Sequence, residues 1–113
     1  MTEIKDAVKI AVEAIREKKG ENIKVFNIAG ISPLADYFVL ATGNNRNQIQ
    51  AMCDEIAESL AKLKIHAKQT EGYESANWIL CDYGDFMIHL FNPESREFYN
   101  LERLWKDATE EEF

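Results

Sequence analysis

The sequence predicts an α/β protein of one domain, in which a mixed β-sheet of about five strands is flanked by helices. The length of 113 residues allows one compact core and no more. Two long segments repeat apolar residues at helical spacing, and several short apolar runs are bounded by turn-forming residues. We expect the domain to span residues 1–105 and the acidic end, residues 106–113, to be a flexible tail.

Both long helices are predicted from apolar stripes and from signals at their ends. Residues 3–19 carry apolar side chains at steps of three and four, with early acids and Gly20 at the end. A second helix, running to about Lys64, follows Asn45 and Gln48, whose spacing resembles a capping box. Its stripe would consist of Ile49, Met52, Cys53, Ile56, Leu60 and Leu63.

Three strands are predicted in the first two thirds of the chain. Residues 23–28 alternate in polarity, and the apolar run 37–41 has the composition of a central strand that is buried on both faces. After the second helix, residues 65–69 are predicted to form a short strand, which would complete a right-handed βαβ unit. Residues 70–77 are predicted to be a loop.

Residues 78–91 have the pattern of a β-hairpin, because two apolar runs flank a polar turn. We expect Tyr83 and Gly84 to be the two central turn residues, since glycine tolerates the positive φ that such turns require. This turn would pair Trp78 with His89 and leave alternate residues on opposite faces.

A short helix is predicted after the hairpin. Asn92, Pro93 and Glu94 supply an N-cap, a proline at the first helical position and an early acid. The apolar residues of this stretch that could pack are Phe98, Leu101, Leu104 and Trp105.

The two faces of the hairpin differ. One has a purely apolar set: Ile79, Cys81, Phe86, Ile88 and Leu90. The other, which we call the Trp78 face, consists of Trp78, Leu80, Met87, His89 and Phe91. Two arrangements fit: a helix covers each face, or both long helices cover the apolar face and leave the Trp78 face partly open. An open Trp78 face with carboxylates at its rim has the anatomy of a protein-binding site. The candidate partner-binding residues are Glu71, Trp78, Leu80, Asp82, Tyr83, Gly84, Asp85, Met87, His89 and Phe91.

Charge and cysteine content restrict the possible partners and compartment. The formal charge of −7 argues against a basic face for nucleic acid and favours a basic partner. Cys53 and Cys81 stand in apolar patterns, which is typical of buried thiols in a reducing compartment. The chain start mixes both charge signs and no apolar run approaches ~18 residues, so we expect a cytoplasmic protein without a membrane span.

No segment carries a strong catalytic signature. Asp82, Asp85 and His89 could hold a divalent cation, but across a tight turn the two carboxylates could instead bind backbone N–H groups. His66 and His89 lack the spacing of a zinc site, and Gly43 before a helix is a weak sign of a phosphate loop. We therefore expect no catalytic residue, no metal and no cofactor, and a protein that is not an enzyme.

A set of motifs runs through nearly the whole chain. They are Asp36-Tyr37-Phe38-Val39 with Ala41-Thr42-Gly43-Asn44, then Trp78, then Asp82-Tyr83-Gly84-Asp85 with His89 and Phe91, and the ending Arg96-Glu97-Phe98-Tyr99-Asn100-Leu101-Glu102-Arg103-Leu104-Trp105. In order and spacing these motifs resemble the Iojap family of ribosomal silencing factors. The chain departs from the usual family pattern at Asn45, Asn47 and Cys81.

The resemblance implies a sheet of nucleotidyltransferase-like topology and no reaction. It also implies a protein that docks on ribosomal protein L14 of the large subunit; from the acidic charge we expect little direct nucleic-acid contact. Bound there, it would block joining of the small subunit and repress translation under nutrient limitation; a role in late large-subunit biogenesis is associated with the family.

Two alternatives remain beside this expectation. One is a metal-dependent nucleotidyl or phosphoryl transferase that uses Asp82, Asp85 and His89. Against it, Gly43 is followed by Asn44 where such enzymes have Ser, and the next strand lacks their paired carboxylates. The other is a homodimer in which the Trp78 face pairs with itself.

Overall fold

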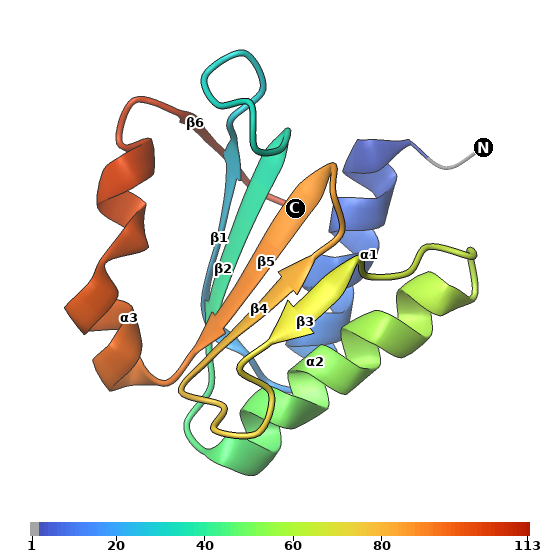
Figure 1. The fold of residues 1–113 in the computed structure, drawn as a ribbon, viewed down its shortest axis with the longest axis vertical. Helices are drawn as coiled ribbons and strands as arrows, with labels where there is room; N and C mark the ends of the chain where they lie inside the picture. The colour runs from blue at the N-terminus through green and yellow to red at the C-terminus, as the bar shows by residue number, and fades with distance from the viewer. Residues whose placement is uncertain (1–2) are drawn as a thin grey trace.

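The computed structural model describes residues 3–113, so the first two residues of the mixed-charge start lie outside the described residues. A six-stranded sheet forms the centre of the molecule, with two long helices on one face and a short helix on the other (Figure 1). The helices are α1 (Ile4–Glu17), α2 (Arg46–Ala61), α3 (Pro93–Tyr99) and a 3-10 helix (Leu101–Trp105). The strands are β1 (Glu21–Asn27), β2 (Tyr37–Thr42), β3 (Gln69–Glu71), β4 (Trp78–Asp82), β5 (Phe86–Phe91) and β6 (Thr109–Glu111).

The sheet is mixed, which confirms the predicted α/β class. Its order is β3-β4-β5-β2-β1-β6. The central pair β2 and β5 is parallel, and all other neighbouring strands are antiparallel. The apolar run in β2 is buried throughout, as predicted for a central strand.

The last strand was not predicted. Residues 109–111 pair with β1, with Glu111 opposite Val25, and Asn27 donates from Nδ2 to Glu111 Oε2 over 2.9 Å. Lys5 of α1 also lies 3.2 Å from Glu111. The segment expected to be a flexible tail therefore contributes a strand to the sheet, and the domain extends beyond residue 105.

The third strand lies later in the chain than predicted. It is Gln69–Glu71 instead of 65–69, and the loop before β4 begins at Gly72. Ile65 and Ala67 pack against the helix-side core without forming a strand. β3 is an edge strand separated from β2 by β4 and β5, so the predicted βαβ unit does not join neighbouring strands.

Two core layers lie on the two faces of the sheet. The larger layer joins both long helices to the apolar face of the hairpin, and its fully buried members include Val8, Val12, Ile15, Ile49, Met52, Ile56, Leu60, Ile79, Ile88 and Leu90. The helical stripes are thus confirmed except at Leu63, which is 41% exposed because α2 ends at Ala61.

The smaller layer lies under α3 and the 3-10 helix and consists of Phe26, Ile28, Ala35, Phe38, Leu40, Phe91 and Trp105. Trp105 is buried as expected, whereas Phe98 and Leu104 are 81% and 65% exposed. The prediction that both would pack was wrong. The helical path breaks at Asn100, whose φ of 45° lies in the left-handed region and redirects the chain.

Both predicted asparagine caps are present. Asn45 Oδ1 accepts from the backbone N–H of Gln48 over 2.8 Å, and Gln48 Oε1 accepts from Asn44 N over 2.7 Å. At α3, Asn92 Oδ1 accepts from Ser95 N over 2.7 Å. Among the described residues, no helix has the length and apolar character needed to cross a membrane.

Candidate protein-docking surface

The hairpin register differs from the predicted one by two residues. Trp78 lies opposite Phe91 and Leu80 opposite His89. The turn residues are Gly84 and Asp85, closed by a 3.1 Å hydrogen bond from Tyr83 N to Phe86 O. Gly84 takes the positive φ of 85° at the first turn position, which suits glycine. Because strand side chains alternate with a period of two, this shift leaves the paired residues on their predicted faces.

The Trp78 face is partly open. Both long helices cover the opposite face of the sheet, and α3 lies on the Trp78 side over the β1–β2–β5 region (Figure 1). Over β4 and the turn end of β5, Trp78, Leu80 and Met87 remain only partly buried. The structure therefore has the second of the two arrangements, with α3 covering part of the face.

Tyr99 extends this surface, and sequence reasoning missed it. Its ring centroid lies 4.6 Å from that of Trp78, and the side chain is 49% exposed. Phe91 supports Trp78 from below, with ring centroids 5.3 Å apart. The signal that could have found Tyr99 is the helix start fixed by Asn92, which sends α3 back over the strand it follows. We call Trp78, Leu80, Met87 and Tyr99 the docking surface.

A hollow of about 270 Å³ lies at the edge of the docking surface, lined by Glu71, Gly72, Trp78 and Leu80. Gly72 has a φ of 80°, and a Cβ there would come within 2.1 Å of the Trp78 carbonyl oxygen. Only glycine lets the loop approach β4 this closely. The loop thus forms one wall of the hollow.

Carboxylates surround the docking surface on the β3 and turn sides. Glu71 is exposed opposite Leu80, and Asp85 is exposed in the turn. Asp82 is half-buried, and its Oδ1 accepts from Gly84 N over 2.8 Å, which is the turn role that the sequence allowed. None of the three forms an ion pair with the described residues. The rim of the docking surface is therefore negatively charged.

Three of the predicted partner-binding residues are buried. Tyr83 lies on the helix side, stacked on Phe86 at 5.0 Å between ring centroids, and its burial raises the pKa of the phenol. It is therefore turned away from the Trp78 face. His89 and Phe91 belong to that face but lie beneath the docking surface, with exposures of 4% and 0%.

The His89 ring is engaged with its neighbours. Trp78 Nε1 donates to His89 Nδ1 over 2.9 Å, and burial lowers the pKa of the imidazole to about 4.

Within residues 3–113, no three His, Cys, Asp or Glu side chains lie close enough to hold a metal ion. The geometry at the turn thus does not assemble the metal site of the transferase alternative.

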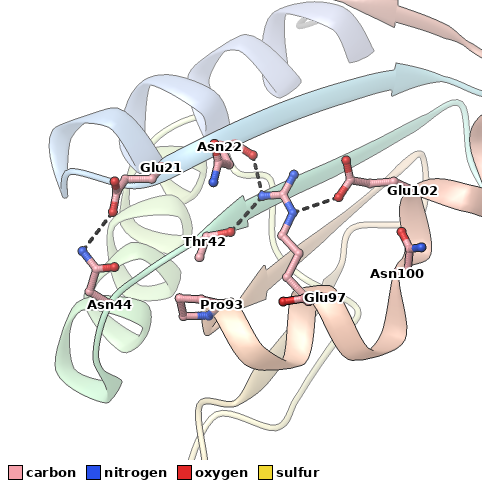
Figure 2. Close-up of a pocket in the computed structure, with 9 residues that line it drawn as sticks. Glu21, Asn22, Thr42, Asn44, Pro93, Glu97, Asn100 and Glu102 are labelled. Atoms are coloured by element: carbon pink, nitrogen blue, oxygen red, sulfur yellow. Dashed lines mark hydrogen bonds and ion pairs between the residues drawn. The ribbon is translucent and has the colours of Figure 1, made fainter.

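A larger cavity lies along α3, between this helix and the ends of β1 and β2 (Figure 2). It has a volume of about 500 Å³ and is lined by Glu21, Asn22, Thr42, Asn44, Pro93, Arg96, Glu97, Asn100 and Glu102. None of these is a predicted site residue. The hydrogen bond from Asn44 Nδ2 to Glu21 Oε1, 2.9 Å long, crosses one side of it.

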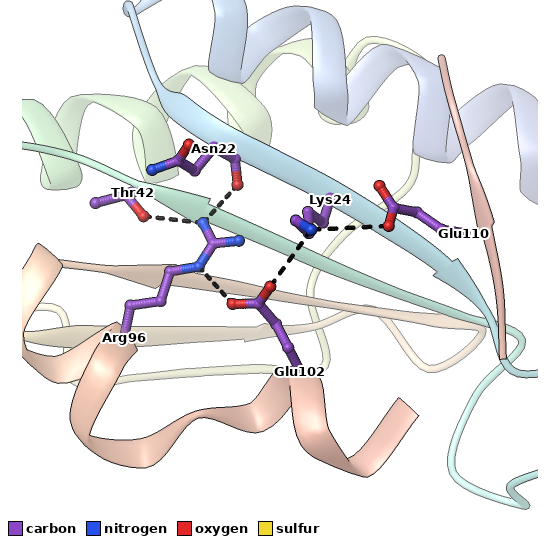
Figure 3. Close-up of polar contacts among 6 residues, drawn as sticks. All are labelled: Asn22, Lys24, Thr42, Arg96, Glu102 and Glu110. Carbon is purple, nitrogen blue, oxygen red and sulfur yellow. Dashed lines mark hydrogen bonds and ion pairs between the residues drawn. The ribbon is translucent and has the colours of Figure 1, made fainter. Parts of the chain in front are cut away.

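Arg96 in this cavity fastens α3 to the sheet (Figure 3). Its guanidinium donates from Nη1 to Thr42 Oγ1 over 2.9 Å and to the carbonyl oxygen of Asn22, and from Nε to Glu102 Oε1 over 3.1 Å. Lys24 lies 3.7 Å from the other oxygen of Glu102. The residue is 8% exposed, so its charge is compensated within the fold. Through this network the sheet fixes the helix that carries Tyr99.

The two thiols lie side by side in the helix-side core. Cys53 of α2 and Cys81 of β4 are both free and buried, with their Sγ atoms 3.7 Å apart. The hydrogen bond to Cys53, together with burial, raises the pKa of the Cys81 thiol, and the same bond lowers the pKa of Cys53. The expectation of buried thiols is confirmed for both residues.

A half-open sheet face with aromatic centre and acidic rim is the anatomy of a small α/β binding protein. Comparison with known proteins makes the class specific. The family model described as "Ribosomal silencing factor during starvation" (RsfS) matches residues 1–113. The ribosomal silencing factor RsfS of Halalkalibacterium halodurans is 41% identical over 103 residues, which are 91% of this chain and 88% of that protein. The RsfS of Bacillus subtilis is 41% identical over 104 residues, 92% of this chain and 88% of that protein.

The fold agrees with a solved structure. A crystal structure of a protein from Chromobacterium violaceum superposes with a TM-score of 0.90 at 29% sequence identity, and the match covers 99% of this chain and 92% of that one. The chain belongs to the RsfS family of ribosomal silencing factors. The resemblance to this family is thereby confirmed, and with it the prediction of a non-enzymatic protein.

Proposed function

We propose that this chain binds ribosomal protein L14 on the large ribosomal subunit through its docking surface. In this position it sterically blocks association with the small subunit and represses translation in the cytoplasm under nutrient limitation. The same contact on late precursors of the large subunit would give it a role in biogenesis. The observation that carries the proposal is the partly open aromatic face, with Trp78 against Tyr99 at its centre.

The chemistry of this surface supports a basic protein as partner. Aromatic and methionine side chains are enriched at the centres of protein interfaces, and a few of them supply most of the binding free energy. Glu71, Asp82 and Asp85 at the rim complement Lys and Arg on the partner, and the net charge of −7 attracts such a partner over a distance. The same charge disfavours direct contact with ribosomal RNA.

Co-sedimentation tests the proposal. The purified protein is mixed with isolated large subunits, isolated small subunits and joined ribosomes. We expect recovery with large subunits alone, and Trp78→Ala should lose about 2–4 kcal/mol of binding free energy. Light scattering of mixed subunits gives the second readout, because a bound silencing factor should lower the extent of subunit joining.

A matched control separates the docking surface from general loss of apolar surface. Leu63 is also partly exposed but lies after α2, on the helix side of the sheet. Leu63→Ala should bind large subunits like the unmodified protein. Recovery with no particle, or equal binding by Trp78→Ala and the unmodified protein, would contradict the proposed surface.

The docking surface also supports a second candidate, a homodimer of the free protein. Its exposed aromatic side chains are typical of a surface that is covered in some state. Sedimentation equilibrium should then show a mass that rises with concentration, and Trp78→Asp should keep the protein monomeric. A monomer at all concentrations would remove this candidate and leave ribosome binding unaffected.

A further inference from the structure

His89 and Trp78 are diagonal neighbours on the Trp78 face. His89 of β5 lies directly opposite Leu80 of β4, and Trp78 is two residues before Leu80 on β4. The indole Nε1 donates to His89 Nδ1 over 2.9 Å, and the ring centroids are 5.8 Å apart. A partly exposed aromatic ring of the docking surface is thus bonded to a side chain that is almost fully buried.

The imidazole is held rigidly by aromatic neighbours. Its centroid lies 4.3 Å from that of Phe38 and 6.1 Å from that of Phe91, and the second distance belongs to a stacked pair. Because Nδ1 accepts the hydrogen bond from the indole N–H, the neutral imidazole carries its own proton on Nε2. Nε2 is buried and has no hydrogen-bond partner among the described residues.

A histidine in this position is costly for stability. A buried donor without a partner destabilises the folded state, and a phenyl ring would fill the same aromatic pocket without that penalty. The one contact that His89 makes and a phenylalanine could not make is the bond from Trp78. The residue is therefore better explained by what it does for Trp78 than by its contribution to the core.

We infer that His89 is a positioning residue for Trp78. The bond fixes the rotation of the indole, so that its ring stays against Tyr99 and Phe91 and presents the same face to a partner. Without the acceptor, the half-exposed ring is free to rotate and must be ordered again on binding. Preorganisation of an anchor raises affinity by removing this ordering cost. The consequence for binding rests on the proposed function; the orientation of Trp78 does not.

The first test needs no partner. Proton–nitrogen correlation spectra of the unmodified protein should show His89 with a bare Nδ1 and a protonated Nε2. His89→Phe should shift the indole Nε1–H signal of Trp78, identified by its loss in Trp78→Phe, while the signal of Trp105 stays in place. His89→Asn restores an acceptor near the position of Nδ1 and should return the Trp78 signal toward its original place.

The second test measures binding to large subunits. His89→Phe should have an unchanged or higher Tm and yet bind about ten-fold more weakly, the value of one lost hydrogen bond. His89→Asn should recover part of the affinity. In a Trp78→Phe background, which has no indole donor, His89→Phe should have no further effect on binding, as a double-mutant cycle would show.

Each of these measurements has an outcome that would contradict the positioning role of His89. A protonated Nδ1, or a Trp78 signal that His89→Phe leaves unmoved, would overturn the positioning role. Full additivity in the cycle would also overturn it, because His89 would then act on binding through something other than the Trp78 bond. If Trp78→Ala binds subunits normally while the spectra behave as expected, the proposed function fails at this surface and the positioning role stands.

Discussion

The two faces of the sheet are built from the same strands and differ in how completely they are covered. On the helix side, alternate residues of β4 and β5 meet α1 and α2, and every one of them is buried. On the Trp78 side, the neighbouring residues of the same strands lie under the short α3 and the 3-10 helix and remain partly exposed over β4. Alternation along a strand thus lets one residue pack in the core while its neighbour takes part in the proposed docking surface.

The largest expected difference is between two neighbours on β5. Ile88 is fully buried on the helix side, and Met87 is half-buried on the docking surface. Ile88→Ala should lower the free energy of unfolding by about 3–4 kcal/mol, because it leaves a cavity among packed side chains. Met87→Ala should lower it by about 1 kcal/mol or less and weaken large-subunit binding instead. Urea unfolding and co-sedimentation measure the two effects, and equal stability losses would contradict the division between faces.

A pH titration of stability sharpens the comparison for the Trp78 side. Burial lowers the pKa of His89 to about 4, below its ordinary value of 6.5. At this histidine the unfolded chain therefore binds a proton at higher pH than the folded chain does. The contribution of His89 to the free energy of unfolding is fully present above pH 6.5 and is lost as the pH drops toward 4. The loss from this group should reach about 3 kcal/mol.

Other groups titrate in the same range, so the measurement is a difference between variants. His89→Phe should remove this share of the pH dependence between pH 6.5 and 4. His66→Phe changes an exposed histidine and should leave the share of His89 in place. Identical pH profiles for the His89 variant and the unmodified protein would show that His89 is not buried as a neutral ring.

The sequence predicted elements well where burial imposes a period. The spacing of Ile49, Met52, Ile56 and Leu60 predicted α2. The period of two along a strand assigned the faces of the hairpin correctly, even though its predicted register was two residues off. The turn itself was misplaced by one position: Tyr83 N donates to Phe86 O, so the two turn residues are Gly84 and Asp85, and Asp82 Oδ1 accepts from Gly84 N. That one-position change moved Tyr83 from the expected binding surface into the core.

Elements without a buried apolar pattern were missed or misplaced. β3 is exposed along its length, and β6 is formed by a Thr-Glu-Glu segment whose partner lies more than eighty residues earlier in the chain. Local propensity carries no signal for such edge strands, because pairing with the existing sheet creates them. Tyr99 was missed for a related reason, since it joins the docking surface only after α3 folds back over β5.

Replacement of the buried Arg96, on the Trp78 side of the sheet, should lower the free energy of unfolding by an intermediate amount. Arg96→Met keeps the apolar stem and removes three hydrogen bonds that join α3 to Thr42, Asn22 and Glu102. We expect a loss of about 2 kcal/mol in the free energy of unfolding, in the range of hydrogen bonds to charged groups. Large-subunit binding should weaken as well, because α3 carries Tyr99. Arg103→Met, at an exposed position of the adjacent 3-10 helix, should leave stability and binding unchanged.

The smallest expected effects come from the two helix caps, which test both faces in the same way. Asn45 caps α2 and Asn92 caps α3, each through its Oδ1. Replacement by Ala should cost about 1 kcal/mol of stability in either case. Only Asn92→Ala should also weaken binding to large subunits, because α3 has seven residues and depends on its cap to hold Tyr99 against Trp78. Equal binding losses for the two variants would mean that affinity follows global stability, and recognition would then not be confined to the Trp78 side.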